Sequence, residues 1–170
     1  MDAYLDIETT YGQSISVIGV YRPDRGTIQL VGGGVNDVSL YAALDGVTAL
    51  HTFNGASFDL PVIKQRLHAD LKREFAHCDL LRECRRQGLR GGLKIVEQKI
   101  GVARATAGVS GQDAPRLWHA YETYGDQAAL ELLLRYNRDD VIYLPRLRAY
   151  LRKLPEEELH PAIAVWDGAP

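Results

Sequence analysis

The first half of the chain alternates short apolar runs with turn-forming residues, a pattern typical of β-strands. The segment 22–26, which reads Arg-Pro-Asp-Arg-Gly, and the triple glycine at 32–34 separate these runs. A Pro-Asp-x-Gly turn favours an antiparallel hairpin between the strands on either side of it. We therefore predict strands at 4–8, 15–21 and 27–31, a short helix at 37–43, and a further apolar strand at 47–53.

Apolar residues in the second half recur at the three- and four-residue spacing of helices. Ser57 is expected to cap the helix at 57–67, and Gly101 to end the helix at 93–100. Pro145 interrupts the last, which is either one kinked helix or two helices that meet there. The predicted helices span 57–67, 79–86, 93–100 and 126–153. This order of strands and helices indicates an α/β fold, with helices covering both faces of a mixed central sheet.

Composition supports one globular domain, because 46% of the 170 residues are hydrophobic and no stretch has a disordered composition. We expect the domain to cover 1–154 and an irregular tail to follow at 155–170. No apolar run is long enough to span a bilayer, and Asp2 and Asp6 interrupt any signal-like N-terminus. Cys78 and Cys84 form no metal-binding pattern, so we expect two reduced thiols, a cytoplasmic location and no membrane partner.

The net charge of −2 argues against a purely electrostatic nucleic-acid binder, which is usually strongly basic. It leaves room for an enzyme that reserves carboxylates for metal ions. Basic residues are concentrated in one short stretch that holds a single acid, Glu83. This stretch is either a solvated helix face or a surface that contacts phosphates. Its members are Arg82, Arg85, Arg86, Arg90 and Lys94.

Four acids stand out by their positions. Asp6 and Glu8 are two residues apart on a predicted strand, so their side chains share one face. Asp59 follows the end of a predicted strand, where active sites of α/β sheets gather. Each has a structural alternative: a strand with one wet face, or an acid that favours a helix N-terminus. Together, carboxylates of this kind are how proteins hold Mg²⁺ for phosphate chemistry.

Tyr136 and Asp140 are four residues apart on a predicted helix and therefore point toward the same region. They lie beside the apolar stripe of that helix, which lets them look toward the sheet. The structural alternative is a boundary tyrosine beside an exposed acid. Asp139 lies about 100° further round the helix, and we expect it to be solvated.

The combination of these motifs resembles a known family. Asp-x-Glu near the N-terminus, Asn-x-x-x-Phe-Asp at 54–59 and Tyr-x-x-x-Asp at 136–140 resemble the DEDDy exonucleases. These are 3′-5′ exonucleases of the ribonuclease H-like superfamily, related to the proofreading domains of family B DNA polymerases. The segments 79–81, 92–97 and 136–141 are most similar to the predicted exonucleases of the YprB type, and the resemblance covers about 2–152.

Two positions refine this resemblance. The sister DEDDh group has histidine five residues before its last acid, where this chain has Arg135, so the tyrosine type fits. Members of the YprB group often carry serine before the Leu-Lys pair, where this chain has Gly92. That departure leaves the role of the loop open and does not affect the acids.

The resemblance implies a ribonuclease H-like fold and a 3′-5′ exonuclease that hydrolyses single-stranded DNA or RNA with a free 3′ end. Two divalent cations, Mg²⁺ or Mn²⁺, would be held by Asp6, Glu8, Asp59 and Asp140. Tyr136 would orient the attacking water, because a group with a reference pKa of about 10 is a poor base near neutral pH.

Four further residues are implied to contact the substrate: Thr9, Asn54, Phe58 and Lys94. Phe58 could equally belong to the core, and Asp79 is assigned to helix capping before catalysis. Two other functions stay open at this point. One is a structure-specific endonuclease, since ribonuclease H-like folds also cut internally, and the other is a non-catalytic nucleic-acid-binding module.

Overall fold

A computed structural model of the chain describes residues 1–104, 106 and 108–153. A five-stranded sheet in the order β3-β2-β1-β4-β5 forms its centre. β1 pairs antiparallel with β2 and parallel with β4, while β2 and β3 form the antiparallel hairpin and β4 and β5 pair in parallel. The strands are β1 Asp2–Thr9, β2 Ile15–Arg22, β3 Gly26–Val31, β4 Ala49–Thr52 and β5 Ala76–Asp79.

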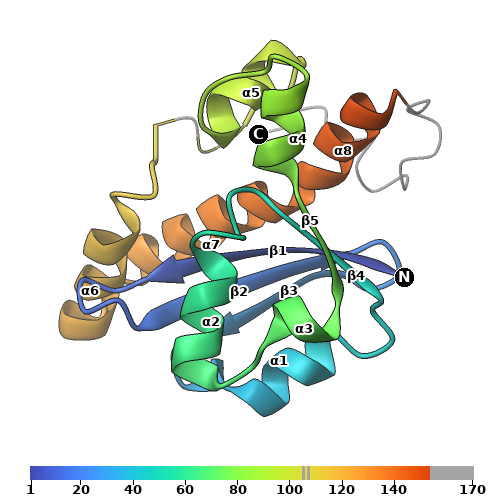
Figure 1. The fold of residues 1–170 in the computed structure, drawn as a ribbon. Coiled ribbons are helices and arrows are strands. Elements are labelled where there is room, and N and C mark those ends of the chain that lie inside the picture. The colour runs from blue at the N-terminus through green and yellow to red at the C-terminus, as the bar shows by residue number, and fades with distance from the viewer. Residues whose placement is uncertain (105, 107, 154–170) are drawn as a thin grey trace.

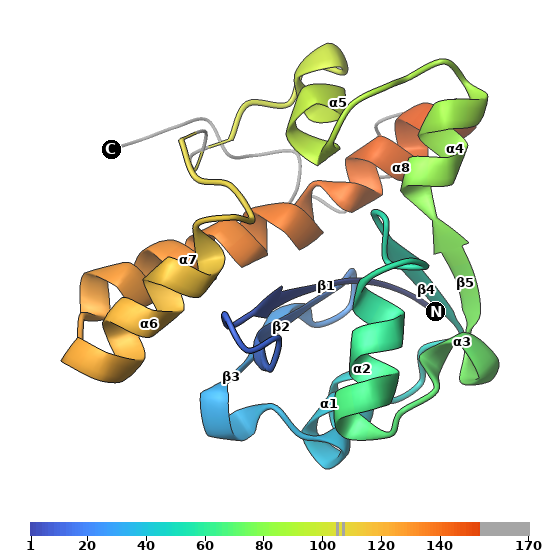
Figure 2. The ribbon, with the colours of Figure 1, turned by 60° about the vertical axis from the view of Figure 1, so that its left-hand side comes forward.

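Helices cover both faces of this sheet (Figures 1 and 2). α1, α2 and α3 lie on one face. α7 crosses the other face, with α6 beside its first turns, and α4 and α5 stand on the same side next to α8. The bounds are α1 Asp37–Ala43, α2 Asp59–Leu67, α3 Leu71–Glu74, α4 Leu80–Arg86, α5 Leu93–Lys99, α6 Ala114–Tyr124, α7 Gln127–Ile142 and α8 Leu144–Arg152, with a 3₁₀ turn, η1, at Gly32–Gly34.

The alternation of side chains along β1 divides the core between the two faces. Leu5 and Ile7 pack on the α1–α2 side, in a cluster with Leu40 and Ile63. Tyr4 points the other way, into a cluster formed by α4, α5, α7 and α8. A mixed sheet with an antiparallel hairpin and helices on both faces is therefore confirmed. Asp6 and Glu8 share the face of Tyr4, which is the face that α7 crosses.

The C-terminal helical pattern divides into two helices. α7 ends at Ile142, and α8 begins at Leu144 with Pro145 in its first turn. Proline fits there because it lacks the N–H that the first turn leaves without a helical partner, and because its fixed φ is already helical. The second of the two alternatives for this segment is correct.

Other details differ from the prediction. Ser57 does not cap α2: the helix begins at Asp59, its N-cap residue is Phe58, and no side chain caps it. Three elements were not predicted, namely α3, β5 and α6. The expected irregular tail at 155–170 lies outside the described residues. Cys78 and Cys84 are free thiols, and Cys84 is buried in the core.

None of the helices in the described ranges is long and apolar enough to cross a membrane.

Candidate metal centre

β1 extends beyond its parallel neighbour, and this overhang exposes its acids to a cleft. β4 pairs with β1 only as far as Tyr4 and His51. The backbone of β1 after that point lacks a parallel strand partner. The N–H of Ile7 instead donates to the Asp59 carboxylate at 3.0 Å. Asp59 therefore takes the place of a strand partner, and this ties the first turn of α2 to the strand that carries the other acids.

α7 brings the last acid to the same place. Tyr136 and Asp140 are one helical turn apart, and both are buried. One carboxylate oxygen from each of three acids lies within 4.8 Å of the other two, and these acids are Asp6, Glu8 and Asp140. The sequence-based expectation that β1 and the late helix converge therefore agrees with the geometry. Asp59 borders the same space as these three residues but is not in their compact group.

A buried amide links α7 to β1. The Asn137 Nδ2 donates to Asp6 Oδ2 at 3.1 Å, and its Oδ1 accepts from Gln29 Nε2 at 2.9 Å. Asn137 occupies the space above Gly19, the β2 residue paired with Asp6. Any Cβ at Gly19 would overlap the Asn137 side chain. A glycine is therefore required at this point of β2 if the amide is to reach Asp6.

Burial and mutual repulsion make the metal-free carboxylates hard to ionise. Burial first, then the neighbouring acids, holds the pKa of both Asp6 and Glu8 well above the usual range. Burial raises the pKa of Asp59 to about 7, although the Ile7 N–H opposes the shift. Burial also raises the pKa of Asp140, and the Arg104 guanidinium beside it opposes that rise.

These features fit a divalent cation. Glu8 Oε1 is buried and has no hydrogen-bond partner among the described residues. A buried carboxylate oxygen without a partner is costly unless something else satisfies it. The compact group offers only oxygen atoms, which are the ligands that Mg²⁺ and Mn²⁺ prefer. The cluster of Asp6, Glu8 and Asp140 is therefore consistent with a divalent metal site.

Tyr136 keeps its proton in this setting. Burial first, and then the carboxylates of Asp140, Glu8 and Asp6, raises the pKa of Tyr136 far above its usual range. The Lys94 ammonium lies 4.8 Å from the centre of the Tyr136 ring. The hydroxyl is therefore a hydrogen-bonding group at any ordinary pH and is unsuited to act as a base.

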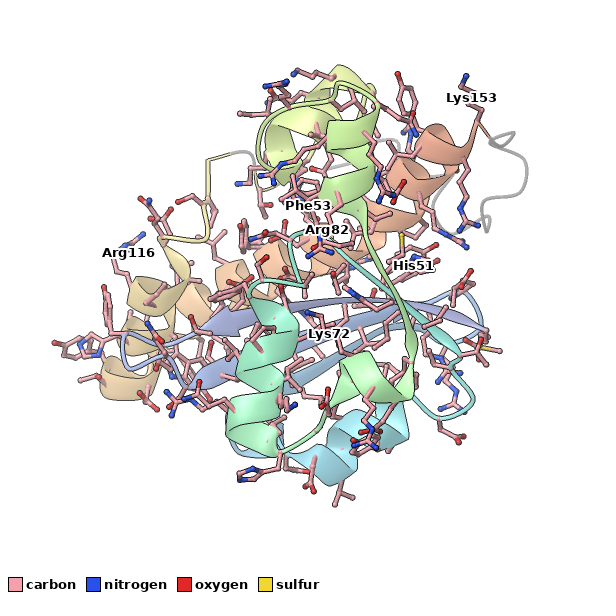
Figure 3. All side chains as sticks on the ribbon, in the orientation of Figure 1. His51, Phe53, Lys72, Arg82, Arg116 and Lys153 are labelled. Carbon is pink, nitrogen blue, oxygen red and sulfur yellow. The ribbon has the colours of Figure 1, made fainter. Side chains whose placement is uncertain are left out.

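Two adjoining hollows surround these side chains. The smaller, of about 180 Å³, is lined by the four acids, Tyr136, and three of the predicted substrate residues, Thr9, Asn54 and Phe58. The larger, of about 940 Å³, starts at Asp6 and Asp140 and runs along Lys94 to Arg85 and Arg90. Phe58 is 43% exposed, so the core alternative for this residue is wrong. Phe53, labelled in Figure 3, lines both hollows and was not predicted.

Asp79 organises the loop that carries Asn54. Its carboxylate caps α4 through the N–H of Leu81 at 3.1 Å, as expected from the sequence. It also accepts the N–H of Asn54 at 2.9 Å and that of Ala56 at 3.1 Å. Asn54 itself has a φ of +67°, a left-handed conformation in which few residues other than glycine are found. Asp79 therefore holds the backbone of the loop that lines the cleft, and its own side chain is not among the lining residues.

Besides Phe53, three site residues escaped sequence analysis: Asn137, Glu97 and Arg104. Asn137 is three residues before Asp140, so its helical spacing would have placed it near the acids. Glu97 was seen only as part of a motif. Arg104 binds both Glu97 and Asp140. The expectation that Asp139 is solvated is wrong: it is buried, and it accepts hydrogen bonds from the Thr106 N–H and hydroxyl.

Comparison with known proteins agrees with this geometry. The family model of the RNase H superfamily matches residues 3–152. The uncharacterized protein YprB of Bacillus subtilis (strain 168) is 30% identical over 178 residues, which cover 92% of this chain and 43% of YprB. The chain therefore spans less than half the length of that relative.

A solved structure is also similar. The family B DNA polymerase from the hyperthermophilic archaeon Pyrobaculum calidifontis matches with a TM-score of 0.63 and 16% identity. The match covers 97% of this chain and 27% of the polymerase chain. At this level of identity the likeness concerns the fold.

The raised pKa of Asp59 predicts how the stability of the metal-free protein depends on pH. The unfolded chain ionises this carboxyl near its usual value of 3.8, and the folded chain only near 7. Stability from this group is therefore lost as the pH rises from about 4 to 7. We expect Asp59→Asn, which still accepts the Ile7 N–H, to melt at a higher temperature than the wild type in EDTA. The difference should grow between about pH 4 and pH 7 and level off at higher pH.

Measuring the two proteins side by side cancels the opposite contributions of His51 and His77, whose pKa values burial lowers. Thermal melts in EDTA supply the measurement. In buffer without EDTA, added Mn²⁺ should raise the wild-type melting temperature more at pH 8 than at pH 5, because the ligands must be ionised. A difference between variant and wild type that shrinks with rising pH would contradict the prediction.

Proposed function

The chain belongs to the RNase H superfamily, and from that premise we propose that it is a metal-dependent 3′-5′ exonuclease acting on single-stranded DNA or RNA. One observation carries the proposal. Asp6 and Glu8 from β1 meet Asp140 from α7 within 4.8 Å, and Tyr136 borders the same cleft one helical turn before Asp140. This arrangement joins a site for cations to a neutral hydroxyl beside it.

Asp6, Glu8 and Asp140 would hold the cations directly, and Asp59 would support them from the first turn of α2. A pair of divalent cations bound there would supply a water of lowered pKa and would stabilise the oxygen that leaves the phosphate. Asn137 keeps the Asp6 carboxylate turned toward the cleft by donating to Oδ2. The Glu8 Oε1 atom is buried and has no hydrogen-bond partner among the described residues, so a bound cation would satisfy it.

Tyr136 would orient the water that attacks the phosphate. Its hydroxyl stays protonated because burial and the nearby acids raise its pKa, so it can donate one hydrogen bond and accept another. Lys94 lies over the ring and restricts its movement. Positioning of this kind requires a fixed hydroxyl and no change in its charge.

The small hollow would receive the 3′-terminal nucleotide. The half-exposed ring of Phe58 offers a face on which a base can stack, and Asn54, which lines the same hollow, offers a side-chain amide. Thr9 lies at the end of β1 next to the acids and would approach the terminal hydroxyl.

The large hollow would guide the rest of the strand. Lys94, Arg85 and Arg90 line it, whereas Arg82 and Arg86 do not. Arg86 instead forms an ion pair with Glu83 on the exposed side of α4. The basic stretch therefore divides into a part that faces the cleft, which we assign to phosphate contact, and a part that corresponds to the solvated face.

The direct test is digestion of single strands labelled at either end. With Mg²⁺ or Mn²⁺, a 5′-labelled strand should give a descending ladder, and a 3′-labelled strand should release labelled mononucleotide at once. Excess EDTA should stop both, because the ligand set is made of oxygen alone. Circular single strands should resist digestion. Cleavage of circles would favour the endonuclease, and early loss of a 5′ label would reverse the polarity.

Substitutions on α7 should separate metal binding from water positioning. Asp140→Asn removes a charge from the ligand cluster, so Mn²⁺ affinity should fall and hydrolysis nearly vanish. Tyr136→Phe keeps the ring and its packing but loses the hydroxyl. Mn²⁺ affinity should then persist while kcat falls by about 10²–10⁴-fold. Calorimetric titration and single-turnover kinetics give the two readouts.

The matched control is Glu131→Gln, which removes a negative charge from an exposed position on the same helix. Asp139 is unsuitable because its carboxylate holds Thr106. Equal loss of Mn²⁺ affinity in Tyr136→Phe and Asp140→Asn would show that the hydroxyl acts through the metal site and not on water.

Binding of single strands should weaken with added salt despite the acidic net charge, since each neutralised phosphate releases counterions. Arg85→Ala/Arg90→Ala should flatten the plot of log affinity against log salt, by about 0.7 for each phosphate that is no longer neutralised. Arg82→Ala/Arg86→Ala makes the same change in net charge outside the cleft and should keep the wild-type slope. Fluorescence anisotropy in EDTA measures binding without hydrolysis. Equal slopes for the two double variants would remove the assignment.

A further inference from the structure

A buried arginine reaches the metal centre from outside the residues assigned so far. Arg104 lies in the connection after α5, and its side chain is 4% exposed. Its Nη1 donates to Asp140 Oδ1, one of the carboxylates of the ligand cluster. A full positive charge therefore sits beside the place where a divalent cation would bind.

Glu97 fixes the orientation of that arginine. The Nε and Nη2 of Arg104 donate to the two carboxylate oxygens of Glu97, a bidentate pair in which Glu97 is 1% exposed. Two of the three guanidinium nitrogens are engaged in this way, which leaves Nη1 to face Asp140. Planar bidentate pairs of this type restrict the guanidinium more than a single bond does. Arg104 is therefore held in place, and Glu97 uses both its oxygens to hold it.

Further contacts join the region around Arg104 to α7. Lys94, one turn before Glu97 on α5, lies over Tyr136 and donates to the Thr106 carbonyl at 3.3 Å. Thr106 donates in turn to Asp139. The segment from α5 to Thr106 thus meets α7 at Tyr136, Asp139 and Asp140, and Arg104 is its contact with the ligand cluster.

Arg104 offsets part of the negative charge of the cluster before any metal binds. It donates to one oxygen of Asp140, a carboxylate that also interacts with the Tyr136 hydroxyl. A fixed guanidinium repels a dication at the same carboxylate. The same charge lowers the repulsion among Asp6, Glu8 and Asp140 in the metal-free protein. Both effects weaken metal binding, because the arginine favours the empty site and disfavours the loaded one.

We propose that Arg104, held by Glu97, is a positioning residue that acts as a resident cation on Asp140 and sets how tightly the carboxylate cluster binds divalent metal. The inference rests on the metal site of the proposed function, and it does not require the nuclease polarity or substrate assigned above. It predicts opposite effects for the two members of the buried pair. Loss of the arginine charge tightens metal binding, and loss of the glutamate charge, which leaves the arginine uncompensated, weakens it.

Mn²⁺ titration of the full chain by calorimetry, without nucleic acid, tests this. Arg104→Met should bind Mn²⁺ about tenfold or more tightly, and Glu97→Gln should bind it more weakly than the wild type. Arg104→Lys keeps the charge but loses the bidentate pair with Glu97, so its affinity should lie between those of the wild type and Arg104→Met. Arg138→Met removes a positive charge from an exposed position on α7 and is the matched control, with affinity unchanged.

A purely structural role for the pair gives a different result. If the pair only fastens the α5 connection to α7, both single variants disturb the cluster and both weaken Mn²⁺ binding, which overturns the proposal. Unchanged affinity in Arg104→Met, or no Mn²⁺ binding by any of the proteins, overturns it as well. Should Arg104→Met fail to fold, the double variant Glu97→Gln/Arg104→Met removes both buried charges and leaves neither unpaired. It should bind Mn²⁺ more tightly than Glu97→Gln alone.

Thermal melts provide a second readout of the same quantity. The shift in melting temperature caused by a fixed Mn²⁺ concentration should be larger for Arg104→Met than for the wild type, because a ligand that binds only the folded state stabilises it more as its affinity rises. Mn²⁺ binding with the expected order of affinities, but without nucleotide release, would uphold the inference and defeat the proposed exonuclease.

Discussion

Repulsion between like charges is the constraint on which this site depends. Four carboxylates border one small hollow, and each pair of them would separate if nothing offset the repulsion. The offsets come from different parts of the chain. The Asn137 amide donates to Asp6, the Ile7 backbone to Asp59, and the Arg104 guanidinium to Asp140. One oxygen of Glu8 is left without a partner among the described residues, and a bound cation would satisfy it.

The scaffold explains why these donors are available. β1 is central in the sheet but runs past the end of β4, so its last residues have a hydrogen-bonded strand on only one side. The chain that follows β4 turns over this gap, and the Asp79 carboxylate fixes that turn by accepting two of its N–H groups. α7 covers the face of β1 from which the acids project. A cleft therefore forms where a longer β4 would have continued the ladder.

Local spacing predicted the residue pairs within each motif, and the family resemblance predicted that the motifs form one centre. Two residues apart on a strand and four residues apart on a helix place Asp6 with Glu8 and Tyr136 with Asp140. α6 was equally predictable: its buried residues Ala114, Leu117 and Trp118 have helical spacing, and Gly125 ends it. β5 was not, because a four-residue strand is defined by its pairing with β4 and has too few positions to show a pattern.

The supporting residues could not be predicted in the same way. Arg104 meets Asp140 across 36 positions of sequence, and Gln29 meets Asn137 across 108. No local pattern relates such pairs, since only the packing of α5 and the hairpin against α7 brings them together. For Asp139, the local pattern gave a prediction that the tertiary packing overturned. Helical geometry correctly separated it from Asp140, but the loop after α5 covers the face onto which it turns.

The missing side chain at Gly19 has a consequence that reaches beyond β2. Asn137 fills the space above Gly19, where a side chain would otherwise stand. Gly19 therefore sets how closely α7 approaches the sheet, although it has no side chain of its own. Asp6 and Asp140 belong to those two layers, so the same residue fixes the gap across which a metal would be shared. Any larger residue at this position would push α7 away from the sheet. Grafting the three acids onto another sheet would therefore reproduce the centre only if the neighbouring strand also had a glycine opposite the first acid.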